Sequence, residues 1–185
     1  MNISDKFTGF YEDDINGKKI LIEYKNGKKD GIARYFNKNN QLELEIEYKE
    51  DMIDGSLTVY NEFGDIIMEA NYLNGVLNGD MTTYYSNGMT QCKSHYKAGY
   101  QDGKSITYDA FGDISTKSMW KDGKKTGVEQ IYYSKSLGGN IYSITEYVDG
   151  KRHGKQIQYE QDGKILSITT YKFGRAQEYP RTLEC

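Results

Sequence analysis

Apolar and charged residues alternate along the stretches that precede a series of aromatic residues. Counting back from Tyr48 by twos gives apolar side chains, whereas the positions between them are acidic: Ile46, Leu44 and Leu42 against Glu47, Glu45 and Glu43. The same period of two recurs ahead of later aromatics, although small hydroxyl residues such as Ser143 and Thr145 replace the apolar ones there. A period of two with one charged face predicts strands that are half-buried in a sheet.

The aromatic residues that end these stretches are themselves periodic. They are Tyr24, Tyr48, Tyr72, Tyr96, Trp120, Tyr147 and Tyr171, which we call the ladder aromatics. Successive members lie 24 residues apart, except for one step of 27 that contains an insertion around Ser136-Leu137-Gly138. Self-similarity at a fixed period of this size predicts a repeat protein.

Glycines occupy fixed places within each repeat. A first glycine follows most ladder aromatics by three residues, with Asp51 in its place once, and a second glycine follows four residues later. The pairs Asn74-Gly75 and Asn78-Gly79 illustrate both positions, and such pairs predict turns with positive φ. A further aromatic follows five residues after the second glycine: Phe36, Tyr60, Tyr84, Tyr108, Tyr132 and Tyr159. The segments between the turns have strand length, so each repeat is predicted to be one β-hairpin.

The predicted fold class is therefore all-β, with tandem 24-residue β-hairpin repeats that form an elongated, twisted antiparallel sheet. Residues 1–17 are interpreted as a degenerate N-terminal cap or first hairpin, and residues 18–174 as a single-domain repeat array without helices. Residues 175–185, which include Pro180, are interpreted as an irregular C-terminal tail, with a short terminal helix as the alternative.

This pattern resembles the MORN repeat, in the bacterial variant that reads Tyr-x-x-Gly-x-x-x-Gly-x-x-x-x-Tyr-x-x-x-Gly. The clearest example here begins at Tyr72 and runs through Gly75, Gly79 and Tyr84 to Gly88. The resemblance covers roughly residues 10–175 and implies a MORN-like stack of hairpins. Bacterial proteins of this kind are similar to the YwqK-type antitoxins, so the resemblance implies an antitoxin or immunity protein that neutralises a toxin. Eukaryotic relatives of the repeat imply scaffolding or membrane-surface roles instead.

Composition narrows the functional classes. The 185-residue chain has a net charge of −3, a mean hydropathy of −0.80 and two cysteines. No stretch approaches the apolar length of a membrane helix, and the N-terminus lacks an apolar signal core, so a cytoplasmic protein is expected. Two cysteines imply no disulfide framework. The net acidity argues against nucleic-acid binding.

Neither metal chemistry nor catalysis is expected. Cys92 and His95 have a C-x-x-H spacing, but positions three apart on a strand point to opposite faces, and no second pair completes a zinc site. There is no Gly-x-Ser-x-Gly elbow, and the glycine pairs lie between strands rather than before a helix, so they form no P-loop. We therefore expect a non-enzymatic protein without cofactors or metals.

Charge is distributed unevenly along the chain. Residues 1–96 hold 16 acidic and 10 basic side chains, a net charge of −6, whereas residues 97–185 have a net charge of +3. An acidic half can steer a basic partner such as a toxin, which the sheet would neutralise by occluding its active cleft. The predicted partner-binding residues are Glu43, Glu45, Glu47 and Glu69, with Tyr85 and Tyr133 as anchors. The alternatives are a solvated face for the glutamates and cross-strand packing for the tyrosines.

A second hypothesis is a structural scaffold or membrane-surface adaptor. Its sequence basis is a modest group of basic residues near the C-terminal turns: Lys121, Lys124, Lys125, Lys151, Arg152 and Lys155. No amphipathic helix or lipidation motif accompanies these residues, since the terminal Thr-Leu-Glu-Cys is not a C-a-a-X box.

Overall fold

The computed structural model describes residues 6–177, and nearly all of them lie in antiparallel strands or the turns between them. The chain divides into two compact units, residues 1–100 and 101–185, which we call unit 1 and unit 2 and describe separately. The predicted all-β fold of tandem hairpins is confirmed in both units. The predicted segment boundaries at residues 17 and 174 stay predictions.

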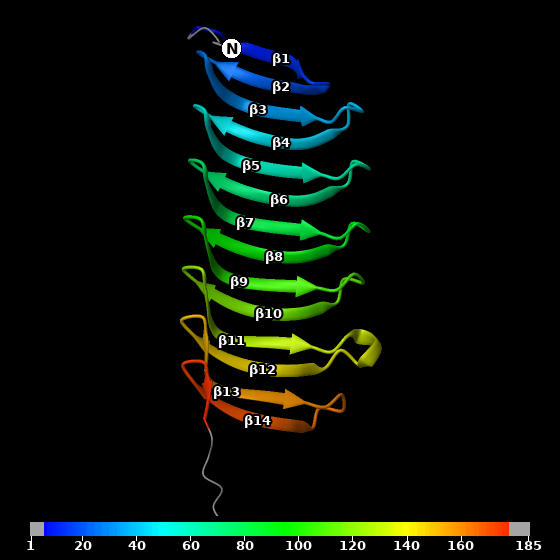
Figure 1. Cartoon of the computed structure of the whole chain (residues 1–185), viewed down its shortest axis with the longest axis vertical. Coiled ribbons are helices and arrows are strands. Elements are labelled where there is room, and N and C mark those ends of the chain that lie inside the picture. Colours follow the sequence, from blue (N-terminus) through cyan, green and yellow to red (C-terminus); the bar gives the residue numbers. More distant parts are fainter. Residues whose placement is uncertain (1–5, 178–185) are drawn as a thin grey trace, which may run out of the picture. The chain divides into compact units, whose positions relative to one another are not determined.

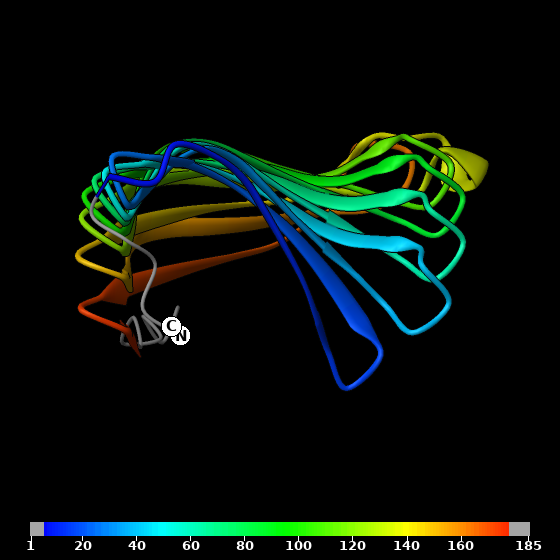
Figure 2. The ribbon, with the colours of Figure 1, turned by 90° about the horizontal axis from the view of Figure 1, so that it is seen from above.

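Unit 1 is an antiparallel sheet in which each strand pairs with the next strand of the sequence (Figure 1). Its strands are β1 (Gly9–Ile15), β2 (Lys18–Lys25), β3 (Lys28–Phe36), β4 (Leu42–Lys49), β5 (Met52–Tyr60), β6 (Ile66–Leu73), β7 (Val76–Tyr84) and β8 (Thr90–Lys97). The loop ends of its hairpins fan out in succession from β1 to β8 (Figure 2), which is the usual twist of a sheet.

Unit 2 repeats the same meander. Its strands are β9 (Tyr100–Tyr108), β10 (Ile114–Lys121), β11 (Lys124–Tyr132), β12 (Ile141–Val148), β13 (Lys151–Tyr159), β14 (Ile165–Lys172) and β15 (Arg175–Ala176). Each strand again pairs antiparallel with its sequence neighbour.

No helix within residues 6–177 has the length and apolar character that crossing a bilayer requires.

The tight turns after the ladder aromatics donate hydrogen bonds to the preceding hairpin. Asn74 and Gly75 both have positive φ, 50° and 79°, as the two-residue hairpin turn requires. The Gly75 N–H donates to the Ile53 carbonyl at 2.7 Å, and the Asn74 N–H donates to the Asp54 carboxylate at 3.2 Å. Asp51 adopts φ 68° and donates its N–H to the preceding hairpin at 2.9 Å, so this departure from glycine keeps the turn.

The second glycine of each repeat was wrongly predicted to lie in a turn. Gly31 lies inside β3 and Gly79 inside β7, at positive φ of 119° and 117°, and the pairing register shifts beside both. These glycines are therefore β-bulges, because the facing strand supplies fewer residues across the same stretch. In Asp30-Gly31 and Asn78-Gly79 the glycine has the predicted positive φ, but it lies inside a strand and not in a hairpin turn.

The core is a single thin layer on one face of each sheet, which we call the ladder face because the ladder aromatics lie on it. The residue two positions before the ladder aromatic is buried in six repeats: Ile22, Ile46, Ala70, Ser94, Ser118 and Thr145. Ala33 is fully buried between Ile22 and Ile46 on the neighbouring strands. The predicted alternation is thus confirmed, and the buried residue at this position changes from an apolar to a hydroxyl side chain at Ser94, within unit 1.

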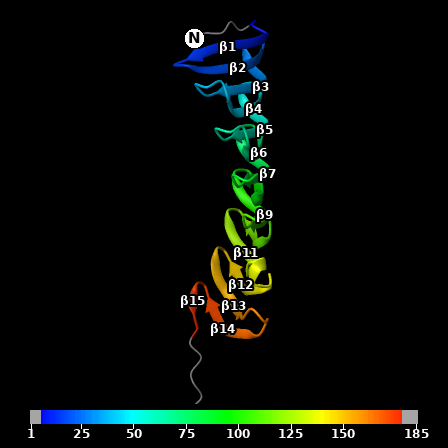
Figure 3. The same cartoon turned by 90° about the vertical axis from the view of Figure 1, so that its right-hand side faces the viewer.

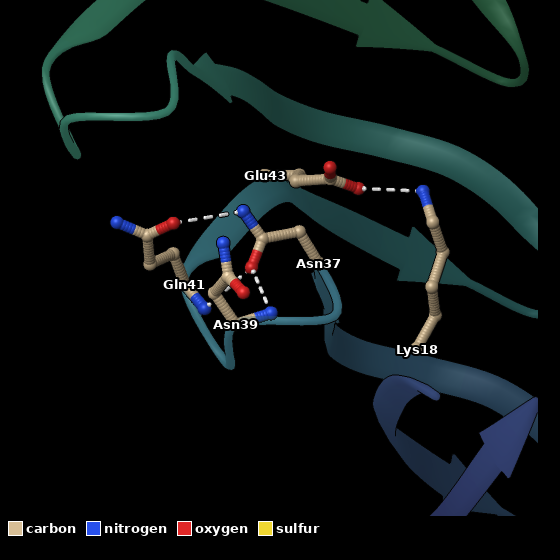
Figure 4. A network of polar contacts seen from close by, with 5 residues as sticks. All are labelled: Lys18, Asn37, Asn39, Gln41 and Glu43. Atoms are coloured by element: carbon tan, nitrogen blue, oxygen red, sulfur yellow. Dashed lines mark hydrogen bonds and ion pairs between the residues drawn. The ribbon is translucent and has the colours of Figure 1, made fainter. Parts of the chain in front are cut away.

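The longer loops, at the other end of the hairpins, are closed by side chains. The Asn37 side-chain carbonyl accepts the N–H groups of Asn39 and Gln41 at 2.9 and 3.0 Å, and its amide donates to the Gln41 side chain (Figure 4). The side-chain oxygens of Asn61 and Asp109 accept the corresponding two backbone N–H groups in their loops. This arrangement leaves the loop tips Phe63 and Phe111 largely exposed, at 78% and 85%.

Two local features differ from the sequence prediction. The insertion forms one turn of 3-10 helix, η1 (Lys135–Leu137), because three extra residues allow Leu137 to donate its N–H to the Ser134 carbonyl. The predicted irregular tail instead starts with the short strand β15 beside β14 (Figure 3). Residues 178–185, including Pro180 and the alternative terminal helix, lie outside the described residues.

Candidate protein-binding site

The predicted glutamates lie on the face of unit 1 opposite the ladder face, which we call the charged face. Cross-strand pairing places one row of side chains across it: Leu21, Arg34, Glu45, Thr58, Glu69, Thr82 and Lys93. Glu45 and Glu69 therefore share a row, two strands and about 10 Å apart. The structure brings together all four glutamates on strands β4 and β6.

Glu43 and Glu45 are already paired with cations of this chain. Glu43 Oε2 lies 3.1 Å from Lys18 Nζ (Figure 4), and Glu45 Oε2 lies 2.7 Å from Arg34 Nε. The Glu45 side chain is 28% exposed, compared with 42% for Glu43. The negative charge of these two carboxylates is therefore largely balanced by the neighbouring lysine and arginine.

Glu47 caps the bulge at Gly55. Its Oε2 accepts the Ser56 backbone N–H at 3.1 Å, and a Cβ on Gly55 would lie only 2.1 Å from that oxygen. Glu23 covers Gly31 and Glu146 covers Gly154 in the same way. Glu47 therefore has a structural role that the sequence prediction missed. Its signal is an acidic residue directly before the ladder aromatic, eight residues ahead of the second glycine.

Glu69 is exposed and has no lysine or arginine partner within the described part of the chain. It accepts a hydrogen bond from the Tyr84 hydroxyl, and this bond, followed by burial, raises the pKa of that hydroxyl above its usual value of 10.0. Glu69 also lines a shallow hollow of about 250 Å³ with Ser56, Thr58, Asp80 and Thr82. Hydroxyl and carboxylate oxygens thus converge in one place and can accept hydrogen bonds from a basic side chain.

Asp80 is the residue of this hollow that the sequence prediction missed. Its carboxylate is 80% exposed and lies 2.8 Å from His95 Nδ1. Asp80 is one of seven acidic residues between positions 50 and 92, a stretch that contains no lysine, arginine or histidine. This acidic stretch, which spans β5 to β7, could have been found from the sequence, because it interrupts an otherwise mixed charge pattern.

The predicted anchors Tyr85 and Tyr133 lie in different units. Both are half-buried, and Tyr85 begins the loop in which its N–H donates to the Met89 carbonyl. Tyr133 packs edge-on against Tyr142, with ring centroids 5.2 Å apart, and donates its hydroxyl to the Tyr159 carbonyl at 2.8 Å. The contacts of Tyr133 are those of cross-strand packing, and its role in partner binding stays a prediction.

Cys92 and His95 do not converge. Cys92 Sγ lies 3.3 Å from the Ser94 hydroxyl, whereas His95 contacts Asp80 on the neighbouring strand. Within residues 6–177, no group of three or more histidine, cysteine, aspartate or glutamate side chains could hold a metal ion.

The basic residues of the adaptor hypothesis are partly neutralised inside unit 2. Lys121 Nζ lies 2.8 Å from Asp102, and Lys125 forms an ion pair with the buried Glu129. Arg152 lies over the Tyr171 ring, 4.4 Å from its centroid. Lys125 Nζ likewise lies over the rings of Trp120 and Tyr147. The long Lys125 side chain therefore covers apolar surface of two ladder aromatics.

Stacked hairpins with one packed and one polar face define a class of repeat proteins that present extended surfaces. Three segments match the MORN repeat variant family, residues 29–50, 77–98 and 152–173. Each match covers one loop-connected hairpin, β3–β4, β7–β8 or β13–β14. No curated protein matches the chain. The fold and these matches together indicate a repeat-based binding or scaffold module.

Proposed function

We propose that the protein binds a basic protein through the charged face of unit 1. The observation that carries this proposal is the acidic stretch between residues 50 and 92, with seven acidic residues and no basic one. On the charged face this stretch supplies Glu69 and Asp80, which line the same hollow. A sheet face needs little rearrangement on binding, so it presents these oxygens at low entropic cost.

Charge would act at two stages of this binding. The net charge of −6 in residues 1–96 attracts a cationic surface over a range set by ionic strength. At contact, a lysine or arginine of the partner would fill the hollow between Thr58 and Thr82, where the two carboxylates and the hydroxyls accept its N–H groups. Glu43 and Glu45 contribute less, because each already has a cation of this chain beside it.

The finer proposal is an antitoxin or immunity protein that acts in the cytoplasm. It rests on the resemblance to the YwqK-type antitoxins together with the acidic stretch. In this proposal the protein performs no catalysis and neutralises a basic toxin by covering its active cleft. A scaffold role at an anionic membrane remains the competing proposal, and it would use the turn lysines of unit 2 that have no ion pair among the described residues, such as Lys124 and Lys151.

Affinity capture from the source cells tests the proposal directly. The tagged wild-type protein is compared with the double variant Glu69→Gln/Asp80→Asn and with the matched control Glu43→Gln, whose carboxylate is compensated by Lys18. The proposal expects one near-stoichiometric basic protein, lost with the double variant and kept with the control. For the antitoxin role, that partner must be toxic when it is expressed alone. Recovery of lipids or of copies of the chain alone would contradict protein binding by this face.

A further inference from the structure

The loop that carries the insertion in unit 2 lines a hollow. The loop from Tyr133 to Asn140 carries the 3-10 turn η1, which stands out at the loop end of β11 and β12 (Figure 1). Between this loop and the loop before β10 lies an open hollow of about 550 Å³. That volume falls within the usual range for small-molecule sites, about 300–1,000 Å³.

Aromatic rings form much of the lining of this hollow. Tyr108, Tyr132 and Tyr133 line it together with Ile114 and the backbones of Gly112, Gly138 and Gly139. The Tyr132 hydroxyl donates to the Gln130 side chain at 3.1 Å, and the Tyr133 hydroxyl donates to the Tyr159 carbonyl. Because these two hydroxyls are satisfied within the protein, the rings present apolar carbon to the hollow. A planar aromatic group can stack on or against such rings.

Charged side chains lie in the lining of the hollow and beside it. Lys135 lines it and lies 3.3 Å from Asp113, but its side chain is 77% exposed and can turn to another anion. Lys117 is not part of the lining, but its Nζ lies over the ring of the lining residue Tyr132, 5.0 Å from the centroid, and it has no carboxylate partner among residues 6–177. One ammonium group in the lining and one beside it therefore stand against a single carboxylate, which favours a ligand that carries a negative charge.

We propose that this hollow binds a small aromatic ring that carries a carboxylate, with the ring against the tyrosines and the carboxylate at Lys117 and Lys135. The site lies in unit 2 and does not depend on the charged face of unit 1. The same chemistry occurs in a free aromatic acid and in a polypeptide that ends in phenylalanine, so the test includes both sources.

Titration of the isotope-labelled protein with phenylacetate, followed by amide chemical shifts, tests the proposal. The amides of Gly112, Gly138 and Gly139 report on the hollow, because they belong to the two loops that enclose it. A ligand of about ten heavy atoms is expected to bind with a Kd on the order of 1 mM. Phenethylamine, with the same ring and the opposite charge, and cyclohexylacetate, with the same charge and no aromatic ring, are each expected to bind more weakly.

Substitutions assign the contacts. Lys135→Ala and Lys117→Ala should each weaken phenylacetate binding by about 2- to 5-fold, the usual effect of an exposed charge pair. Lys124→Ala is the matched control, since Lys124 starts β11 at the opposite end of the hairpin, and it should leave the Kd unchanged. Deletion of residues 136–138 restores the 24-residue spacing and should abolish binding. If that deletion fails to fold, the two lysine substitutions still decide the outcome.

A peptide ending in phenylalanine, compared with its C-terminal amide, distinguishes the sources. Tighter binding of the free-acid peptide than of phenylacetate assigns the hollow to a polypeptide C-terminus, and the reverse assigns it to a free aromatic acid. The proposal is overturned if phenylacetate at about 20 mM shifts none of the three glycine amides. It is also overturned if phenethylamine binds as well as phenylacetate, or if both lysine substitutions leave the Kd unchanged.

Discussion

The contact between Glu47 and Gly55 makes a specific prediction about what the second glycine of the repeat does. Alanine at position 55 would place its Cβ 2.1 Å from Glu47 Oε2, 2.4 Å from Cδ and 2.9 Å from Cγ, at a φ of 124° that L-residues rarely adopt. The carboxylate must therefore move away, and its hydrogen bond with the Ser56 N–H must break. The substitution acts on the backbone and on the capping contact at once.

Two contributions set the expected size of the effect. A non-glycine residue in a sparsely populated backbone region costs about 1–3 kcal/mol. Loss of a charge-assisted hydrogen bond at a largely exposed site adds about 1 kcal/mol. Gly55→Ala should therefore lower the free energy of unfolding by about 2–4 kcal/mol. Gly64→Ala is the matched control, because Gly64 also has positive φ, 86°, but a Cβ there meets nothing within 4 Å.

Urea unfolding followed by circular dichroism gives the free energies, and a double-mutant cycle isolates the contact. Glu47→Ala should cost about 1 kcal/mol in the wild-type background, because the Ser56 N–H loses its acceptor. In the Gly55→Ala background the same change should cost nothing, since the carboxylate has already been displaced. The explanation that Gly55 makes room for the Glu47 carboxylate is wrong under two joint results. Gly55→Ala would lower the free energy of unfolding no more than Gly64→Ala, and the effects of Gly55→Ala and Glu47→Ala would simply add.

Two further predictions concern titration and the core of unit 2. The hydrogen bond to Glu69 raises the pKa of Tyr84 above 10.0 in the folded state, so the folded protein holds this proton more tightly than the unfolded chain. This contribution to stability should be fully present below pH 10 and lost as pH rises above it, and Tyr84→Phe should flatten the loss in a pH series of unfolding midpoints. In unit 2, Glu129→Gln should destabilise by about 2–3 kcal/mol, because Lys125 keeps its charge beside Trp120 without a buried carboxylate. Denaturant unfolding measures this cost, and Lys125→Met in the same background should recover part of it.

The hairpins and their two faces followed from the sequence because they depend on local rules that repeat. The period of two places Ile46 inside and Glu45 outside, and six copies of one pattern agree on the same register. Asn74-Gly75 was located correctly because a two-residue turn needs positive φ at both positions. Each of these features depends only on residues close together in the chain.

The features that the sequence did not predict depend on which residues face each other across strands. Gly31 has the same local signal as a turn glycine, and only the register of β2 against β3 shows that it lies under Glu23. Glu129 lies in the core because β11 places it opposite Thr145 on the ladder face, where its carboxylate pairs with Lys125. Asp80 was missed because its hollow needs side chains from β5, β6 and β7 together.

The most direct test of the central claim is the salt dependence of binding between this protein and its captured basic partner. Isothermal titration at low and at physiological ionic strength compares the wild type with Glu69→Gln/Asp80→Asn. The account predicts that the double variant weakens binding by about 10-fold at low salt, and that the difference shrinks as salt is added. An affinity that changes with neither the substitutions nor the salt concentration would contradict binding through the charged face of unit 1.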